Sequence, residues 1–248
     1  MKEMLKGRQA LITGGAGEMA STIAATLAAE GAAIVLLDIN EKALEAVKAD
    51  LESRFEVAVH TYVHDLCDFD GLAGLIDTME RECGAIDILV NVAGITNTIT
   101  YRDITPADWD KMMNINLKSP FFLTRELFFR MEERGFGRIV TLGSISGERG
   151  AKYAGPHYSI SKAGLICFTK VLAKLAGSSG VTANTVSPGI IASRMTDSLG
   201  SQVYSYDVPM DRMGTPQEVA DAVLYLVSPL ANYVTGQNLS VNGGQSMR

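Results

Sequence analysis

Short apolar segments alternate along the chain with longer segments in which apolar residues recur every three or four positions. The short segments are rich in Val, Ile and Leu, and those at 33–38, 86–91 and 138–143 lack strict polar alternation, as strands buried on both faces do. The pattern predicts strands at 10–13, 33–38, 56–63, 86–91, 138–143, 181–187 and 238–242, the last with the weakest signal. It predicts helices near 19–30, 41–53, 69–83, 106–133, 157–176 and 216–227.

Strand–helix alternation of this kind implies parallel strands that are joined by right-handed crossovers. The expected fold class is therefore α/β, a doubly wound (Rossmann-type) parallel sheet of seven strands with helices on both faces. In such sheets ligands bind beyond the carboxyl ends of the strands. Because no linker or internal repeat interrupts the 248 residues, we expect a single domain over 1–248.

Composition and charge exclude some classes of binding partner and some cellular locations. Hydrophobic residues make up 47% and charged residues 20% of the chain, which is typical of globular proteins. The net charge is -6 and Lys and Arg form no cluster, so nucleic acid is not expected as a partner. The apolar runs are too short for a signal peptide or a membrane span. Cys67, Cys83 and Cys167 include no CxxC pair and are expected to be reduced core thiols, which together predicts a cytoplasmic protein.

A glycine-rich turn follows the first predicted strand and opens the first predicted helix: Thr13-Gly14-Gly15-Ala16-Gly17-Glu18-Met19-Ala20. Such a turn presents backbone N–H groups and a helix N-terminus to a pyrophosphate. An ordinary strand-to-helix turn also favours glycine, so the motif alone leaves both interpretations open.

Asp38 closes the second predicted strand, 21 residues beyond Gly17, near the spacing of an acid that binds the adenosine ribose of a dinucleotide. Its carboxylate would accept hydrogen bonds from the ribose and repel a 2′-phosphate, and neither Ile39 nor Asn40 is basic. The position therefore favours NAD over NADP, although a helix-capping role is the plain alternative.

Tyr158 and Lys162 are four residues apart on one predicted helix, so they share a face, and the ammonium is expected to favour ionisation of the phenol. That would make Tyr158 an acid or base near neutral pH. A YxxxK pattern also arises by chance. Ser144, at the end of the fifth predicted strand, could donate to a substrate oxygen. Asn116 lies in the middle of a predicted helix, where either a polar task or simple exposure would explain it.

Taken with these motifs, the whole chain resembles the short-chain dehydrogenase/reductase family. The resemblance extends to Asp65-Leu66, Asn91-Val92-Ala93-Gly94, Ser187-Pro188-Gly189, the segment 212–219, Tyr233 to Gly236, and Val241 to Gly244. It implies a catalytic tetrad of Asn116, Ser144, Tyr158 and Lys162. In this tetrad Tyr158 would exchange the substrate proton and Ser144 would orient the substrate oxygen. Lys162 would lower the phenol pKa and hold the nicotinamide ribose, and Asn116 would hold a water.

The resemblance also implies where the dinucleotide binds. Asp65 would lie near adenine, Asn91 and Gly94 against the adenosine side, Pro188 and Ile191 against nicotinamide, and Ser193 where the family usually has a threonine. The full set of expected cofactor contacts is Gly14, Ala16, Gly17, Glu18, Met19, Asp38, Ile39, Asp65, Leu66, Asn91, Ala93, Gly94, Tyr158, Lys162, Pro188, Gly189, Ile191 and Ser193.

Three residues depart from the family pattern, which usually reads TGxxxGxG in the glycine turn and NNAG after the fourth strand. Glu18 and Ala20 replace two glycines, and Val92 replaces the second asparagine. A carboxylate at position 18 would compete with a pyrophosphate for the positive end of the helix. We therefore expect the Glu18 side chain to point to solvent and to weaken dinucleotide binding without abolishing it.

The first functional hypothesis is an NAD-dependent oxidoreductase that interconverts a secondary alcohol, such as a small polyol or sugar, and its ketone. A short polar lid near 195–212, with Tyr204 and Tyr206, favours a small polar substrate. The alternatives are a 3-ketoacyl-thioester reductase of the same family and a non-catalytic dinucleotide-sensing or scaffold protein. The resemblance suggests a homotetramer or homodimer built on helices 106–133 and 157–176. His60 and His64 lack an evident third ligand, so no metal site is expected, and His157 is interpreted as a rim or surface residue.

Overall fold

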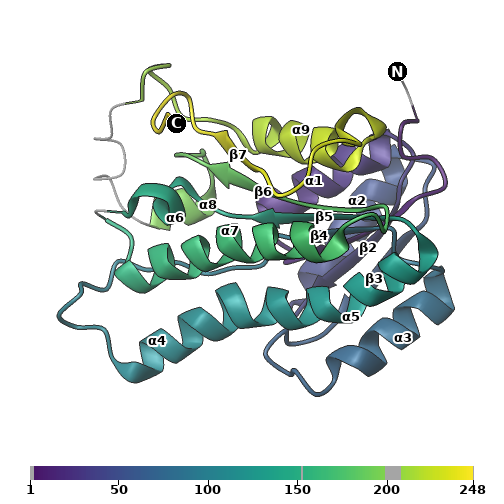
Figure 1. The fold of residues 1–248 in the computed structure, drawn as a ribbon, viewed down its shortest axis with the longest axis horizontal. Coiled ribbons are helices and arrows are strands. Elements are labelled where there is room, and N and C mark those ends of the chain that lie inside the picture. The colour runs from purple at the N-terminus through teal and green to yellow at the C-terminus, as the bar shows by residue number, and fades with distance from the viewer. Residues whose placement is uncertain (1–2, 152, 199–207, 248) are drawn as a thin grey trace.

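The computed structural model describes residues 3–151, 153–198 and 208–247 of the chain (Figure 1). Its centre is a seven-stranded parallel sheet in the order β3-β2-β1-β4-β5-β6-β7. The strands are β1 Gln9–Thr13, β2 Ala33–Asp38, β3 Val59–Val63, β4 Ile88–Asn91, β5 Gly137–Leu142, β6 Val181–Pro188 and β7 Asn238–Val241. The predicted doubly wound α/β fold and all seven predicted strands are confirmed.

Helices cover both faces of the sheet (Figure 1). The longer ones are α1 Glu18–Ala29, α2 Glu41–Arg54, α3 Leu72–Cys83, α4 Pro106–Met113, α5 Ser119–Arg134, α7 Pro156–Ala176 and α9 Pro216–Val227. Helices α1 and α9 pack against one another over one face, while α3, α5 and α7 contribute to the core on the other. The short helices α6 Ile145–Arg149 and α8 Arg194–Ser198 and the 3-10 turn Pro229–Ala231 have no counterpart among the predicted elements.

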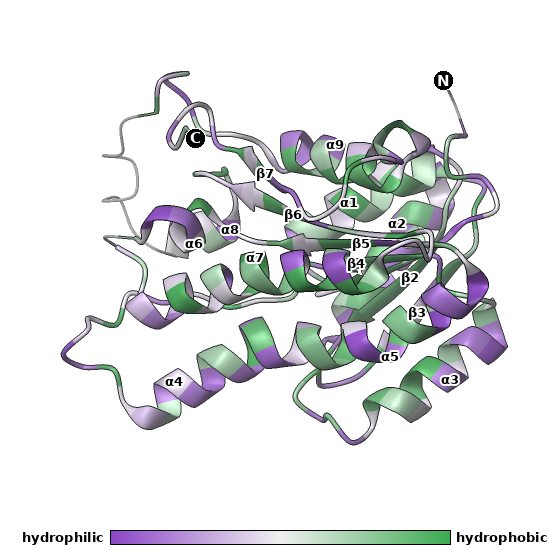
Figure 2. Ribbon diagram, viewed as in Figure 1, coloured by the Kyte–Doolittle hydropathy of each residue, from purple (hydrophilic) through white to green (hydrophobic). Residues whose placement is uncertain are grey.

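Successive strand residues point to opposite sides, so each central strand supplies both cores. Leu11 belongs to the core under α3 and α5, whereas its neighbour Ile12 packs in the core under α1 and α9. Strands β4 and β5 are buried at every position, as their continuous apolar runs predict. The hydropathy colouring of Figure 2 shows green residues concentrated along the strands and on the helix faces that meet them.

The predicted helix 106–133 is interrupted, and this is the main difference from the expected elements. Helix α4 passes into a π-helical turn, Asn114–Lys118, before α5 begins at Ser119. Pro120 has no N–H for the carbonyl of Asn116, and its ring would clash with that carbonyl in a regular α-helix. The Ser119 hydroxyl instead donates to the carbonyl of Asn114 at 2.7 Å. The Ser119-Pro120 pair was the sequence signal for this break.

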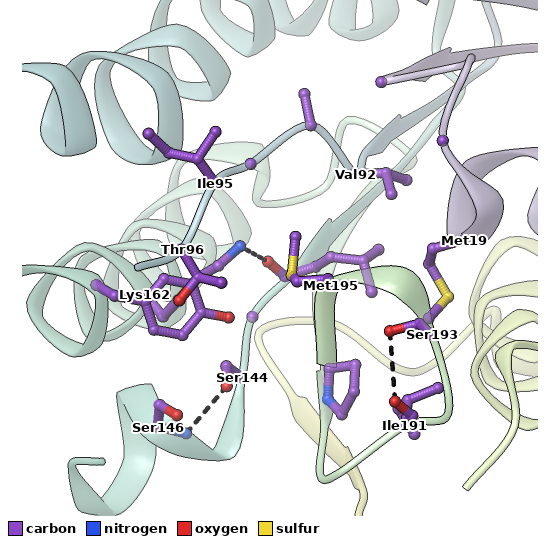
Figure 3. Close-up of a pocket in the computed structure, with 18 of the residues that line it drawn as sticks. Met19, Val92, Ile95, Thr96, Ser144, Ser146, Lys162, Ile191, Ser193 and Met195 are labelled. Atoms are coloured by element: carbon purple, nitrogen blue, oxygen red, sulfur yellow. Dashed lines mark hydrogen bonds between the residues drawn. The ribbon is translucent and has the colours of Figure 1, made fainter. Parts of the chain in front are cut away.

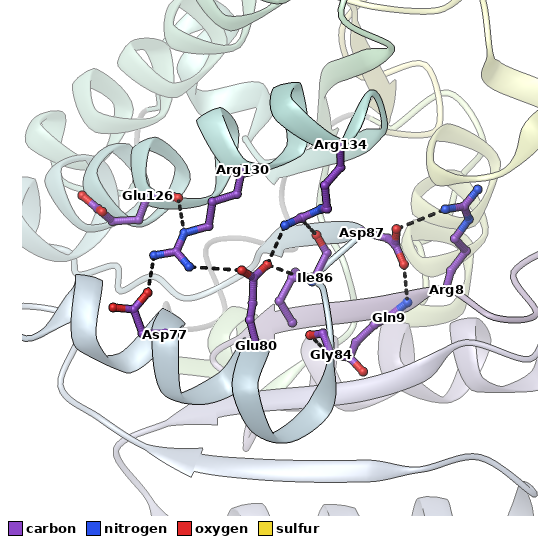
Figure 4. Close-up of polar contacts among 10 residues, drawn as sticks. All are labelled: Arg8, Gln9, Asp77, Glu80, Gly84, Ile86, Asp87, Glu126, Arg130 and Arg134. Atoms are coloured by element: carbon purple, nitrogen blue, oxygen red, sulfur yellow. Dashed lines mark hydrogen bonds and ion pairs between the residues drawn. The ribbon is translucent and has the colours of Figure 1, made fainter.

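Ion pairs stabilise the edge of the sheet where the strands begin, opposite to their carboxyl ends (Figure 4). Glu80 on α3 pairs with Arg130 at 3.1 Å and with Arg134 at 3.0 Å, both on α5. Asp87 accepts from the Arg8 guanidinium and from the backbone N–H of Gln9, each at 3.1 Å. These contacts fasten α3 to α5 and β1 to the segment before β4.

Three further sequence predictions concern membrane spans, cysteines and a lid. No helix among the described residues is long and apolar enough to cross a membrane. Cys67 and Cys83 are half-buried free thiols, but Cys167 is exposed, so the prediction that it belongs to the core is wrong. Tyr204, Tyr206 and half of the expected lid, residues 199–207, lie outside the described residues.

Candidate active site

A cavity of about 580 Å³ lies beyond the carboxyl ends of the strands, next to the point between β1 and β4 where the strand order reverses. This is the expected ligand position in a doubly wound sheet. Its wall holds most of the residues that the sequence singled out: Gly14, Gly17, Glu18, Met19, Asp38, Ile39, Asp65, Leu66, Ala93, Gly94, Ser144, Tyr158, Lys162, Pro188, Gly189, Ile191 and Ser193.

The glycine turn is fixed against the loop after β4. The Thr13 hydroxyl accepts from the backbone N–H groups of Val92 at 3.0 Å and Ala93 at 3.1 Å. Gly14 has a φ of +68°, and a Cβ at this position would lie 3.0 Å from the Cα of Ala93. Only glycine allows both this backbone conformation and this close approach. The two loops thus form one continuous backbone surface at the cavity floor.

Asp38 lies at the end of the cavity next to β2. One carboxylate oxygen accepts from the backbone N–H of Ala16 at 3.2 Å, and the other from that of Asn40 at 3.0 Å. The cap of α2 is Asn40, whose side chain accepts from the N–H of Ala43. The capping alternative for Asp38 is therefore not needed, and its carboxylate is held at the cavity wall.

Tyr158, Lys162 and Ser144 come together at the other end of the cavity, where Figure 3 shows Lys162 and Ser144 facing the same space. Lys162 is buried, its Nζ lies 5.9 Å from the centre of the Tyr158 ring, and it donates to the carbonyl of Leu142 at 2.7 Å. Burial lowers the pKa of Lys162 to about 8. The Ser144 hydroxyl accepts from the N–H of Ser146 at 3.1 Å, which leaves its own hydrogen to donate to the Tyr158 phenol or to a ligand oxygen in the cavity.

The ionisation of Tyr158 differs from the sequence expectation. Burial raises the pKa of its phenol above the ordinary value, and a hydrogen bond from Ser144 opposes the shift only in part. The expectation that the phenol pKa is lowered is wrong in this structure, because desolvation by burial is the largest influence on that pKa. Tyr158 is a protonated phenol at neutral pH, which is the form that can donate a proton.

Asn116 lies in the π-helical turn and its side chain is 0% exposed. Its Oδ1 accepts from the N–H of Ile95 at 2.8 Å, and its Nδ2 donates to the carbonyl of Ile95 at 2.9 Å. Nδ2 also lies 3.2 Å from the Ser161 hydroxyl. The amide therefore binds the loop after β4 to α7, next to Gly94 and Lys162. The π turn is what aims it there, and π turns recur at functional sites.

Three predicted site residues, Ala16, Asn91 and Asn116, do not line the cavity. Asn91 is buried beneath it, where its amide donates to the hydroxyls of Thr124 at 3.0 Å and Thr141 at 3.4 Å. Asn91 thus joins β4 to β5 and α5, and its contact with the adenosine side stays a prediction.

His157 is fully buried, so its interpretation as a rim or surface residue is wrong. Its Nε2 lies 3.2 Å from the Asn97 amide nitrogen, and the Asn97 carbonyl accepts from the N–H of Gly155 at 2.8 Å. Burial lowers the pKa of the imidazole, which is therefore neutral near pH 7. His157 fixes the loop after β4 to the start of α7.

A family model described as enoyl-(acyl carrier protein) reductase matches residues 14–246. The chain belongs to the short-chain dehydrogenase/reductase family. It is thus an oxidoreductase of that family, and the resemblance seen in the sequence is confirmed.

Individual relatives and solved structures have more specific names. The chain is 39% identical to an acetoacetyl-CoA reductase of Allochromatium vinosum over 97% of this chain and 99% of that protein. It superposes with a TM-score of 0.91 and 29% identity on a crystal structure of a 3-oxoacyl-[acyl-carrier protein] reductase with bound NAD from Brucella melitensis, covering 100% of this chain and 94% of the other. A putative gluconate dehydrogenase of Agrobacterium tumefaciens gives a TM-score of 0.93 at 27% identity, with both chains covered completely.

The cavity of this short-chain dehydrogenase/reductase fits a dinucleotide by its own features. Its volume is within the range of cofactor pockets, the Gly14 backbone leaves room against Ala93, and the Asp38 carboxylate is held at the far end. Among the described residues, no group of three or more His, Cys, Asp and Glu side chains could hold a metal ion.

Glu18, the main departure from the family pattern, is exposed at the cavity wall as predicted, but it does not simply point to solvent. Its carboxylate accepts from the backbone N–H of Arg194, the first residue of α8, at 3.3 Å. Glu18 thereby links the glycine turn to the segment after β6.

Gln245 was not predicted as a site residue, yet it lines the cavity from the C-terminal tail. A glutamine in a short polar segment carries no pattern that would mark it. The only signal was the preceding Gly243-Gly244 pair, which turns the tail back with positive φ at both residues.

Proposed function

We propose that this enzyme reduces the ketone of a 3-oxoacyl thioester to the hydroxyl, with NADH as the electron donor. The observation that carries the proposal is the placement of the Tyr158 phenol at the cavity wall beside Ser144 and Lys162, since reduction of a ketone requires a proton donor at this place. The names of the acetoacetyl-CoA and 3-oxoacyl reductases support this substrate class. The comparisons favour it over the small-polyol dehydrogenase of the first hypothesis.

The residues divide the reaction between them. Ser144 donates a hydrogen bond to the carbonyl oxygen and polarises it, while Tyr158 gives that oxygen its proton as charge develops. The ammonium of Lys162 stabilises the phenolate that Tyr158 leaves behind. A bound nicotinamide dinucleotide supplies the hydride. Asn116 keeps the Ile95 backbone in place beside these groups.

The NAD preference is part of the proposal and rests on Asp38. A 2′-phosphate near this carboxylate would meet a like charge, and the adjacent Ile39, 68% exposed, offers no cation. Replacing Asp38 with Ser and Ile39 with Arg should shift the ratio of kcat/KM for NADH over NADPH at least tenfold towards NADPH. An unchanged ratio would show that another residue sets the preference.

The substrate class is tested with the wild-type enzyme by following nicotinamide absorbance at 340 nm. The proposal predicts reduction of acetoacetyl-CoA with a kcat/KM at least tenfold above that for oxidation of gluconate, sorbitol or a simple secondary alcohol. Turnover confined to gluconate or a polyol would return the first hypothesis, and dinucleotide binding without turnover of any substrate would favour the sensor alternative.

We also propose that the chain forms a homodimer or homotetramer through α5 and α7. Apolar side chains remain exposed on these helices, including Phe129 at 59% and Leu175 at 65%, whereas Phe128 packs in the core. Light scattering after size exclusion tests this, and a monomer at micromolar concentration would contradict it.

A further inference from the structure

Two glutamines of this chain are buried to nearly the same extent but differ in what they bind. Gln9 is 7% exposed and Gln245 is 8% exposed. The Gln9 amide donates to the carbonyl of Gly84 at 2.9 Å. Neither Oε1 nor Nε2 of Gln245 has a hydrogen-bond partner in the structure. Buried amides without partners are costly and uncommon, so the second case calls for an explanation.

The backbone around Gln245 is firmly held, so a misplaced tail does not explain the unpaired amide. The Gln245 N–H donates to the carbonyl of Asn242 at 3.0 Å, and its own carbonyl accepts from the Arg149 guanidinium at 2.9 Å. The Asn242 side chain holds the N–H of Gly244 at 2.9 Å and the carbonyl of Ser246 at 2.8 Å.

Ser246, the residue after Gln245, is also held by a hydrogen bond, to Glu148. Glu148 on α6 accepts from the hydroxyls of Ser240 on β7 at 2.7 Å and Ser246 at 3.3 Å. Strand β7, helix α6 and the tail thus form one connected frame. This frame fixes the position of Gln245 and leaves only its amide unpaired.

That amide lies beside Gly189, near the end of the cavity that holds Ser144. A Cβ on Gly189 would be 3.1 Å from Oε1 of Gln245, and both residues line the cavity. Ser144 closes the strand that neighbours β6, and α6 follows it directly, so the tail, α6 and the end of β6 surround the same region. Arg149, also on the cavity wall, adds a positive charge at the same side.

We propose that the Gln245 amide binds the substrate beyond its reacting carbonyl, and thereby selects ketones that carry a second hydrogen-bonding group. This inference rests on the proposed function. In a 3-oxoacyl thioester the second group is the thioester carbonyl or an amide of the carrier arm. Either carbonyl oxygen can accept a hydrogen bond from Nε2 of Gln245, and an amide N–H of the arm can donate one to its Oε1. A plain ketone leaves the amide unpaired and loses this contribution.

The test compares Gln245→Met with Gln9→Met, because methionine keeps the length and volume of glutamine but cannot form these hydrogen bonds. Gln245→Met should lower kcat/KM for acetoacetyl-CoA about tenfold through KM, equivalent to about 1.4 kcal/mol. Its Kd for NADH should stay within twofold and its Tm should stay equal or rise. Gln9→Met should leave kcat/KM unchanged and lower Tm by about 2–4 °C, since the Gly84 carbonyl loses its donor.

Two results would overturn the inference: an unchanged kcat/KM in Gln245→Met, or a loss matched by an equal fall in Tm and in NADH affinity, which is a structural effect. Its failure is separable from that of the proposed function. If the wild-type enzyme does not reduce acetoacetyl-CoA, the proposed function fails, and the same two variants are compared on the polar alcohol that the wild type does oxidise. A selective loss there still supports a recognition role for Gln245, and no loss refutes it.

Discussion

The two ends of the cavity are built in different ways. At the catalytic end, Asn116 and Lys162 are buried and bound to backbone groups on β5 and on the loop after β4. At the end next to β2, which we propose binds the adenosine half of the cofactor, Ile39 and Glu18 are exposed, and Asp38 accepts hydrogen bonds from two backbone N–H groups. The fold therefore holds the proposed catalytic residues in place by itself, whereas the residues proposed to select the cofactor lie at the protein surface. Substitutions at the first end should change turnover and stability, and those at the second mainly binding.

The largest effect is expected at the phenol. Tyr158→Phe removes the proton donor while keeping the half-buried ring in place, and should lower kcat by about 10³-fold, within the range for loss of a general acid. Because the change leaves the adenosine end untouched, the Kd for NADH should stay within twofold in a fluorescence titration. Retention of more than a tenth of the wild-type kcat would refute the role given to Tyr158.

The next effect tests whether the catalytic end depends on its own hydrogen bonds. Asn116→Ala leaves the N–H and carbonyl of Ile95 without their partner and should destabilise the fold by about 1–3 kcal/mol. It should also lower kcat roughly thirtyfold, because displacements near the reacting groups are costly. Ser119→Ala is the matched control, since it alters the same π turn without touching Ile95 and should retain most of the activity. Equal kcat losses in the two variants would contradict a specific role for Asn116.

A pH profile distinguishes the buried cation from the phenol. The pKa of Lys162 is about 8, so its charge is lost as pH rises through that value, while Tyr158 stays protonated because its pKa is raised. The kcat/KM for reduction should be flat below pH 8 and fall up to tenfold for each pH unit above it. Lys162→Met should abolish this inflection. A wild-type kcat/KM that stays flat to pH 10 would show that the charge of Lys162 does not limit the reaction.

The same pKa sets the sign of a stability effect. The unfolded lysine binds its proton more tightly, with a pKa near 10.4. The cost of burying the ammonium is therefore fully present below pH 8 and is relieved between pH 8 and that value. Stability should rise over this window, and Lys162→Met should raise Tm at pH 7 as it removes activity. A fall in Tm would mean that the bond to the Leu142 carbonyl outweighs the desolvation.

The sheet and most of the cavity wall could be predicted because both follow local rules. Buried strands such as 33–38 can be recognised by their continuous apolar residues, and glycine turns can be recognised by their place after a strand. The π turn was not predicted because the helical pattern of apolar residues continues across Pro120. The pKa of Tyr158 was missed because the spacing to Lys162 reveals a charge but not the burial of the phenol. Gln245 was missed because its importance lies in contacts that join β7, α6 and the tail.

The smallest effect is expected at Glu18, where the adenosine half departs from the family. The carboxylate lies at the N-terminus of α1, the positive end that a pyrophosphate would use, and it is also bonded to the N–H of Arg194. Glu18→Gly should tighten the Kd for NADH about twofold to fivefold, since removing a charge near a helix terminus is worth about 0.3–1 kcal/mol. Glu18→Gln separates charge from contact: it keeps an oxygen for Arg194 and removes the repulsion, so it should recover most of the gain. Affinity that is unchanged in both variants would show that Glu18 is neutral towards the cofactor, and weaker binding in Glu18→Gly alone would show that its bond to α8 helps to shape the site.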